Sequence, residues 1–195
     1  MTTLATPAPP ATASVEDRIL EGAARCFTGV GVRKTTVAEI AAAAGITKPT
    51  FYRRYADKTG VVDALVRRET DDLARRMREA SASAPTAAEA VTSAFRIAGR
   101  WLTRHPFVRK SLDLEPELLM PYLNQPEGPV RSTGHAVFAE LVARGTATGE
   151  FRAVDPSAVA EVCWRLVLSF ALTPLAGDAR IEDLVQVTLL QGVLA

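Results

Sequence analysis

The fold is decided by the stretch Thr36-Val-Ala-Glu-Ile-Ala-Ala-Ala-Ala-Gly-Ile-Thr-Lys-Pro-Thr-Phe-Tyr-Arg-Arg-Tyr55. Thr36 and Glu39, three residues apart, have the spacing of a capping box, which sets the start of a helix. Gly45 then permits a tight turn, and Thr47 is placed to cap a second helix. The stretch therefore predicts two short helices joined by a sharp turn, the helix-turn-helix arrangement.

The second of these helices is expected to present polar side chains on its outer face. Phe51 falls on the inward face, so Lys48, Thr50, Tyr52 and Arg53 point outward or toward the flanks. Such a helix can enter the major groove of DNA, where these side chains offer hydrogen bonds to phosphates and base edges. The alternatives are a solvated basic surface for Lys48 and Arg53, and packing in the core for Tyr52.

Positive charge is concentrated around the same stretch. The whole chain has a formal charge of +1, so its composition alone does not indicate a nucleic-acid partner. Between residues 33 and 58, however, two acidic side chains stand against six basic ones, namely Arg33, Lys34, Lys48, Arg53, Arg54 and Lys58. This local surplus can attract phosphate, although it is also compatible with an ordinary solvated surface.

The motif resembles the signature of the TetR family of transcriptional regulators. The resemblance is carried by Thr36, residues 39–41, 44–47 and 50–55, and Lys58. It implies a homodimer with a three-helix DNA-binding head and a larger C-terminal domain that binds a small molecule. On this basis we expect DNA contacts from Thr36, Thr47, Lys48, Thr50, Tyr52, Arg53 and Lys58. Two positions depart from the family pattern, because many relatives have glycine at Pro49 and a stronger helix former at Gly60.

The rest of the chain has helical spacing of its apolar residues and no alternating strand pattern, so the predicted class is all-α with about nine helices. Ser14 is a plausible N-cap for the first helix, and Gly29 and Gly31 end it. A proline-rich segment follows Pro106 and is expected to hold short helices and loops. The longer helices outside the motif are expected at about residues 15–30, 58–80, 86–104, 130–148, 155–173 and 180–195.

The expected organisation is a tail, a small domain and a larger one. Residues 1–13 lack the basic and apolar regions of a signal peptide and are read as a disordered tail. Residues 14–57 form the helix-turn-helix domain, and residues 58–195 form the regulatory and dimerisation domain, with the helix from Lys58 linking the two. Residues 81–85 are a further candidate boundary. We expect a cytoplasmic protein, since no apolar run is long enough to span a membrane.

The bulky and adaptable side chains of the second domain are the candidates for an effector site. They are Trp101, His105, Phe107, Met120, Tyr122, Phe138, Trp164 and Phe170. For each of them the alternative is a place in the hydrophobic core, and His105 can also complement the negative end of its helix. No metal site and no cofactor are expected, because the two histidines have no carboxylate or thiol at ligand spacing and the two cysteines are far apart.

Two C-terminal helices are apolar around most of their circumference and predict a dimer interface. Residues 159–171 are apolar except for polar side chains on one narrow stripe of the predicted helix, and the last helix is similarly apolar. A partner contributing the same two helices would form a four-helix interface. The candidates are Val159, Val162, Leu166, Phe170, Leu184, Val187, Leu190 and Leu194. The alternative is deep burial of these helices within one chain.

The sequence thus predicts a TetR-type transcriptional regulator, a repressor released from a palindromic double-stranded operator by an apolar or amphipathic small molecule. An effector-independent architectural or partner-binding protein that also binds DNA is the alternative. An enzyme is not expected, because no nucleophile–base pair or metal constellation is found. The pair of glycines at 29 and 31 lacks the third glycine of a dinucleotide loop.

Overall fold

The computed structural model describes residues 14–173 and 183–194, and within these the chain is helical. An isolated bridge between Phe151 and Leu194 is the one strand-like pairing among the described residues. The predicted all-α class is confirmed. Of the helices described, none is both long and apolar enough to cross a membrane.

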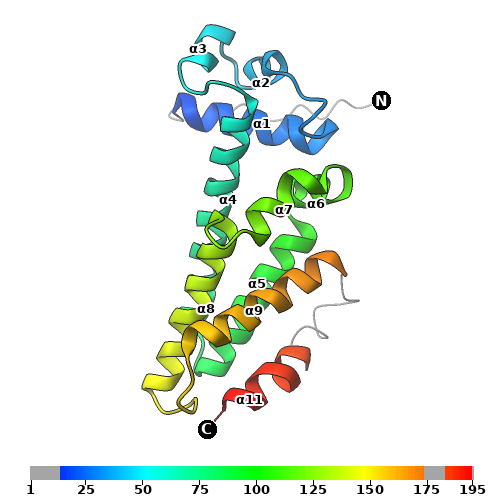
Figure 1. The fold of residues 1–195 in the computed structure, drawn as a ribbon. Coiled ribbons are helices and arrows are strands. Elements are labelled where there is room, and N and C mark those ends of the chain that lie inside the picture. The colour runs from blue at the N-terminus through cyan, green and yellow to red at the C-terminus, as the bar shows by residue number, and fades with distance from the viewer. Residues whose placement is uncertain (1–13, 174–182, 195) are drawn as a thin grey trace, which may run out of the picture. The chain divides into compact units, whose positions relative to one another are not determined.

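The chain divides into two compact units, residues 1–65 and residues 66–195. Unit 1 contains α1 (Val15–Val30), α2 (Val37–Ala43), α3 (Lys48–Tyr52) and the start of α4 (Lys58–Ala82) (Figure 1). Its core is formed by side chains that are at most 1% exposed, including Ile19, Phe27, Ile40, Phe51 and Leu65. Every helix of unit 1 therefore contributes at least one large buried side chain to this core.

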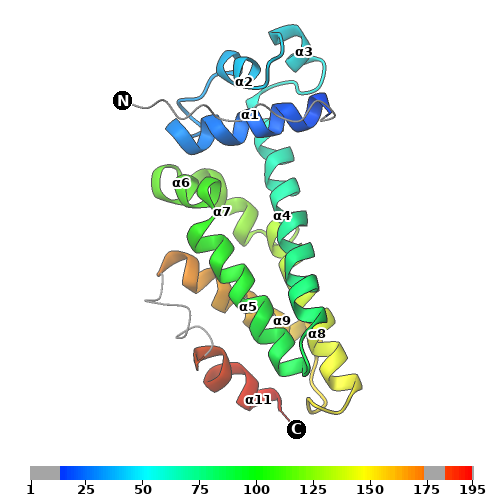
Figure 2. The ribbon, with the colours of Figure 1, turned by 180° about the vertical axis from the view of Figure 1, so that it is seen from behind.

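Unit 2 is built from the remainder of α4 and the helices that follow. α5, α8 and α9 pack against one another, as both views show (Figure 1, Figure 2). The rings of Phe95 and Phe138 lie 4.8 Å apart between α5 and α8. The elements are α5 (Ala87–Arg104), α6 (Pro106–Leu114), α7 (Pro116–Asn124), α8 (Pro129–Ala147), α9 (Pro156–Leu172), the π-helical turn η1 (Gln186–Leu190) and α11 (Gln191–Val193).

Prolines begin four consecutive helices of unit 2. Pro106, Pro116, Pro129 and Pro156 are the first residues of α6, α7, α8 and α9. Proline is favoured there because the first N–H of a helix has no partner within the helix and the fixed φ angle already suits it. The proline-rich segment therefore contains two helices of nine residues each, α6 and α7.

The limit between the two units falls inside α4, between Leu65 and Val66. The sequence predicts the domain limit at Lys58, where this helix begins. α4 continues without interruption to Ala82, and the Ser81 hydroxyl, which is buried, donates to the carbonyl of Ala90 at 3.0 Å. One continuous helix thus belongs to both units.

Candidate nucleic-acid interface

The start of α2 is fixed by a reciprocal capping box. The Thr36 hydroxyl accepts a bond from the N–H of Glu39, and the Glu39 carboxylate accepts from the N–H of Thr36 at 2.7 Å. The carboxylate also accepts from the Thr36 hydroxyl at 2.8 Å. These bonds, with a smaller effect of the Lys58 charge, lower the pKa of the Glu39 carboxyl. Thr36 is exposed, so its hydroxyl serves the cap while lying at the surface.

The turn between α2 and α3 depends on a left-handed residue. Gly45 has a φ angle of +63°, a conformation that side chains with a Cβ rarely adopt. Its N–H donates to the carbonyl of Ala42, and the N–H of Ile46 donates to that of Ala41 at 2.9 Å. These two bonds satisfy carbonyls at the end of α2, as in a Schellman motif. The sharp change of direction predicted at Gly45 is therefore present.

α3 is held by its cap and by one apolar anchor. The Thr47 hydroxyl accepts from the N–H of Thr50 and lies 3.0 Å from the Thr50 hydroxyl. Phe51 is 0% exposed, and its ring contacts those of Tyr52 and Tyr55. The anchor fixes which face of this five-residue helix remains outside.

The outer face of α3 carries the side chains that the sequence singled out. Lys48 and Arg53 are exposed, and Tyr52 is 54% exposed, which excludes core packing for Tyr52 within this chain. A guanidinium nitrogen of Arg53 donates to the Thr50 hydroxyl at 3.3 Å. Thr50 and Arg53 also line a surface depression of about 320 Å³ together with Val15 and Arg54. Donors for phosphates and for base edges therefore share one face.

Two arginines of α1 brace α2, and sequence reasoning did not identify them. Arg18 donates to the carbonyl of Gly45 at 3.1 Å, and Arg25 donates to the carbonyl of Ala43. Cations are favourable beside the carbonyl-rich end of a helix. Their spacing of seven residues puts them on one face of α1, on either side of Gly22, and this spacing was the available signal.

Lys58 lies in a different environment from the other predicted DNA contacts. Its ammonium donates to the carbonyls of Val32, Arg33 and Thr35 at 2.6, 3.2 and 2.8 Å. An ammonium has three N–H donors. Lys58 thus ties the first turn of α4 to the loop that precedes Thr36, and its contact with phosphate stays a prediction.

The candidates for an effector site whose side chains the structure describes lie in different surroundings. Phe107, Phe138 and Trp164 are at most 4% exposed, and the Trp164 indole donates to the carbonyl of Leu123 at 3.1 Å. Trp101 and His105, in contrast, line a surface groove. Met120 and Tyr122 are half-buried on α7, and the side chain of Phe170 lies outside the described residues.

The predicted dimer residues also differ in exposure. Val162, Leu184 and Val187 are 47%, 40% and 62% exposed, which is unusual for large apolar side chains. Val159, Leu166 and Leu194 are half-buried, and Leu190 is buried within its own chain. The exposed members are the ones that a partner subunit would have to cover.

Comparison with known proteins agrees with this geometry. Residues 19–65 match the family model described as bacterial regulatory proteins, tetR family. The HTH-type transcriptional repressor KstR2 of Rhodococcus jostii strain RHA1 is 42% identical over 65 residues, which are 33% of this chain and 32% of that protein. The matched stretch spans about a third of the length of the curated relatives.

Solved structures extend the likeness of fold to nearly the whole chain. The fatty acid degradation regulator FadR from Bacillus halodurans superposes with a TM-score of 0.68 at 18% identity, covering 94% of this chain and 97% of its own. AibR in complex with isovaleryl coenzyme A and operator DNA gives 0.57 at 20% identity, covering 87% and 95%. At such identities the likeness shows a shared fold.

Proposed function

We propose that this chain, whose residues 19–65 match the family model of bacterial regulatory proteins of the tetR family, is a transcriptional regulator that binds an operator in double-stranded DNA as a homodimer. The observation that carries the proposal is the outer face of α3. Lys48, Tyr52 and Arg53 are exposed there, while Phe51 anchors the helix in the core. A helix fixed in this way can present the same atoms to the major groove at every encounter.

The operator should be a palindrome if the regulator is a two-fold dimer. Each subunit would place one α3 in the major groove, with the two half-sites one helical turn apart, ~34 Å. Selection of bound fragments from random DNA, followed by sequencing, tests this. Recovery of one inverted repeat supports the proposal, whereas fragments with no common sequence contradict it.

Substitutions on α3 test the interface directly. Lys48→Ala and Tyr52→Ala should each weaken binding to the selected operator by about 10- to 100-fold, because each removes contacts made at the groove. Fluorescence anisotropy measures the affinity, and thermal unfolding shows that both variants remain folded. Lys110→Ala, which removes the same charge from α6 in unit 2, is the matched control and should bind as the parent does.

The same variants distinguish base contacts from phosphate contacts. If Lys48 reads a base, Lys48→Ala should relax the sequence preference at one operator position. If Lys48 contacts a phosphate, all sequences should weaken alike, and the slope of log affinity against log salt should fall by about 1. Unchanged operator affinity in both Lys48→Ala and Tyr52→Ala would contradict the proposal that α3 contacts DNA.

We further propose that the regulator is a repressor released by an apolar or amphipathic small molecule. The AibR structure contains both isovaleryl coenzyme A and operator DNA, and KstR2 is described as a repressor. In this chain α4 belongs to both units, so a ligand that shifts α4 in unit 2 acts on a helix that also begins at the DNA-binding unit. Release of the operator by a ligand would then follow from a changed spacing of the two α3 helices.

An effector-independent DNA-binding protein remains the second candidate, and one observation favours it. A Cβ added at Gly134 would lie 2.5 Å from the Trp164 ring, so the backbone of α8 packs directly on that ring and leaves no space for a ligand between them. An architectural protein would bind all DNA with similar affinity and lose it equally as salt rises. Measurement of salt dependence on operator and random DNA separates the two candidates.

A further inference from the structure

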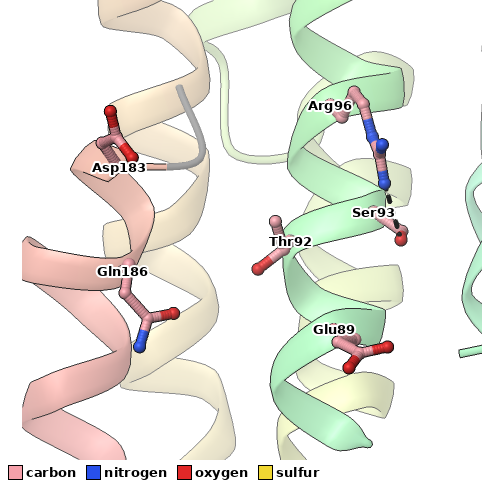
Figure 3. Close-up of a pocket in the computed structure, with 6 residues that line it drawn as sticks. All are labelled: Glu89, Thr92, Ser93, Arg96, Asp183 and Gln186. Carbon is pink, nitrogen blue, oxygen red and sulfur yellow. Dashed lines mark hydrogen bonds between the residues drawn. The ribbon is translucent and has the colours of Figure 1, made fainter. Parts of the chain in front are cut away.

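A polar groove of about 430 Å³ lies between α5 and residues 183–186 in unit 2 (Figure 3). It is lined by Glu89, Thr92, Ser93, Arg96, Asp183 and Gln186. These side chains carry charges of both signs, and Arg96 donates to the Ser93 hydroxyl at 3.2 Å. Of the six described residues, none has a buried side-chain nitrogen or oxygen without a hydrogen-bond partner. The groove therefore shows no unsatisfied buried group that a ligand would have to complete.

Two buried side-chain nitrogens in the described part of the chain do lack a hydrogen-bond partner, namely Nε of Arg18 and Nδ1 of His105. His105 belongs to unit 2, where its other ring nitrogen lies 3.1 Å from the Glu69 carboxylate. Arg18 lies on α1 in unit 1, beside the turn that leads into α3. A buried N–H without a partner costs free energy, so other bonds must keep the Arg18 side chain in this position.

The Arg18 side chain is held at the C-terminal end of α2. Its Nη2 donates to the carbonyl of Gly45 at 3.1 Å, and Arg25, seven residues further along α1, donates to the carbonyl of Ala43. The three carbonyls before that of Ala43 accept from backbone N–H groups that follow the helix. The two arginines thus extend the capping of α2 at the end where cations are favourable.

The start of α1 is also tied to the far side of α3. The Tyr55 hydroxyl donates to the Glu16 carboxylate at 3.2 Å. Gly45 lies three residues before α3, and Tyr55 lies three residues after it. Side chains from the first turns of α1 therefore bind the chain on both sides of the short helix that carries the proposed DNA contacts.

We propose that Arg18 and Arg25 are positioning residues for operator recognition, which set the place and angle of α3 by holding the end of α2 and do not touch DNA themselves. The inference rests on the function proposed above and names residues outside α3 that determine its specificity. Hydrogen bonds to base edges depend on direction and distance, whereas attraction to phosphates depends mainly on charge. Loss of the bonds to α2 should therefore weaken operator binding more than binding to random DNA.

The bonds are tested first without DNA, by amide hydrogen exchange on the full chain. Arg18→Met removes the donors and keeps an unbranched apolar stem. The N–H groups of residues 44–46 and of α3 should exchange about tenfold faster than in the parent, whereas those of α5 should exchange at the parent rate. Arg25 is exposed, so Arg25→Met tests the same end of α2 without disturbing a packed side chain.

The effect on recognition is measured with the selected operator and with random DNA, by anisotropy over a series of salt concentrations. In Arg18→Met and in Arg25→Met the ratio of the two affinities should fall about tenfold, with the salt slope of operator binding as in the parent. Arg25→Lys keeps a cationic donor and should restore most of the ratio. Lys34→Met removes a charge from an exposed loop of unit 1 and is the matched control, whose ratio should stay as in the parent.

Three results would overturn the proposal. A salt slope that falls by about 1 would show that these arginines contact phosphates directly. Exchange at the parent rate around α3 would show that they do not hold the turn, and an unchanged affinity ratio would show that holding it has no part in specificity. If no operator can be selected, the proposed function is contradicted and with it the role in recognition, while faster exchange would still show that the arginines hold the turn.

Discussion

Gly22 lies where the backbones of α1 and α2 pack closely together. A Cβ built at this position would lie 2.9 Å from the nitrogen of Ala44 and 3.1 Å from the carbonyl oxygen of Ile40. These are backbone atoms, so they cannot move aside as a flexible side chain can. The contact sets how deeply α2 sits on α1, and through the Gly45 turn it also sets where α3 begins.

We expect Gly22→Ala to destabilise the protein and Gly29→Ala to stabilise it. Both glycines lie in α1, where alanine is favoured over glycine by roughly 0.5–1 kcal/mol. An added Cβ at Gly29 meets nothing within 4 Å, so this gain should appear there in full. At Gly22 the clash with α2 should exceed it and cost about 1–3 kcal/mol. Urea unfolding measures the free energy of unfolding of both variants. A gain in stability from Gly22→Ala would contradict the prediction, because it would show that α2 can move away from the added methyl group at little cost.

At the residue scale, local spacing predicted more of the interface than any other signal. The capping box of Thr36 and Glu39 and the turn at Gly45 depend on neighbours within five residues, and the structure shows both. The bonds from Arg18 and Arg25 to the end of α2 join residues 27 and 18 positions apart. The spacing of residues within α1 does not predict which backbone carbonyls its arginines will contact.

At the scale of elements, the first turn of α4 raises the question of what Lys58 does. Its ammonium is bound by the carbonyls of Val32, Arg33 and Thr35, which makes it a tie between α4 and the loop before α2. Lys58→Met keeps the apolar stem and removes the donors. We expect it to lower the free energy of unfolding by about 1–3 kcal/mol, since hydrogen bonds to partly buried acceptors are lost.

The phosphate contact predicted for Lys58 leads to a different result. In that case Lys58→Met should leave stability unchanged, weaken binding to all DNA alike and lower the salt slope by about 1. Lys34→Met, in the same loop and exposed, controls for the loss of charge, and its effect on unfolding should stay within about 0.5 kcal/mol. Urea unfolding and salt-dependent DNA titration of the two variants decide between the roles.

Prolines explain why elements of unit 2 were harder to predict than those of unit 1. In the sequence they mark possible breaks, and the segment after Pro106 was accordingly expected to hold short helices and loops. The segment does hold two short helices, in which Pro106 and Pro116 occupy first helical positions, and α7 continues through Pro121. A proline inside a helix removes one backbone bond, and packing of the buried Leu119 and Leu123 offsets this cost.

At the scale of the whole molecule, residue type alone did not predict which bulky side chains share a site. Phe107, Phe138 and Trp164 are buried, while Trp101 and His105 lie on a groove whose other wall is α4. The spacing of apolar residues along a helix predicts which face of that helix is turned inward. It does not predict which other helices pack against that face, or whether their packing leaves space for a ligand.

Exposed apolar side chains near the C-terminal end of the chain make the dimer testable. Val162 on α9 is 47% exposed and Val187 on η1 is 62% exposed. In a two-fold interface every residue occurs twice, so Val162→Lys places two unpaired ammonium groups in one buried surface. We expect the dimer dissociation constant to rise by about 100-fold or more, which sedimentation velocity over a concentration series would show.

Val30→Lys is the matched control for this prediction. Val30 is 50% exposed but lies at the end of α1 in unit 1, so the same substitution there should leave the dimer intact. Operator affinity should fall with dimerisation in Val162→Lys, because a monomer engages one half-site and loses the linked contribution of the other. If Val162→Lys and Val187→Lys both remained dimeric, the two-fold interface would have to be formed by other elements of unit 2.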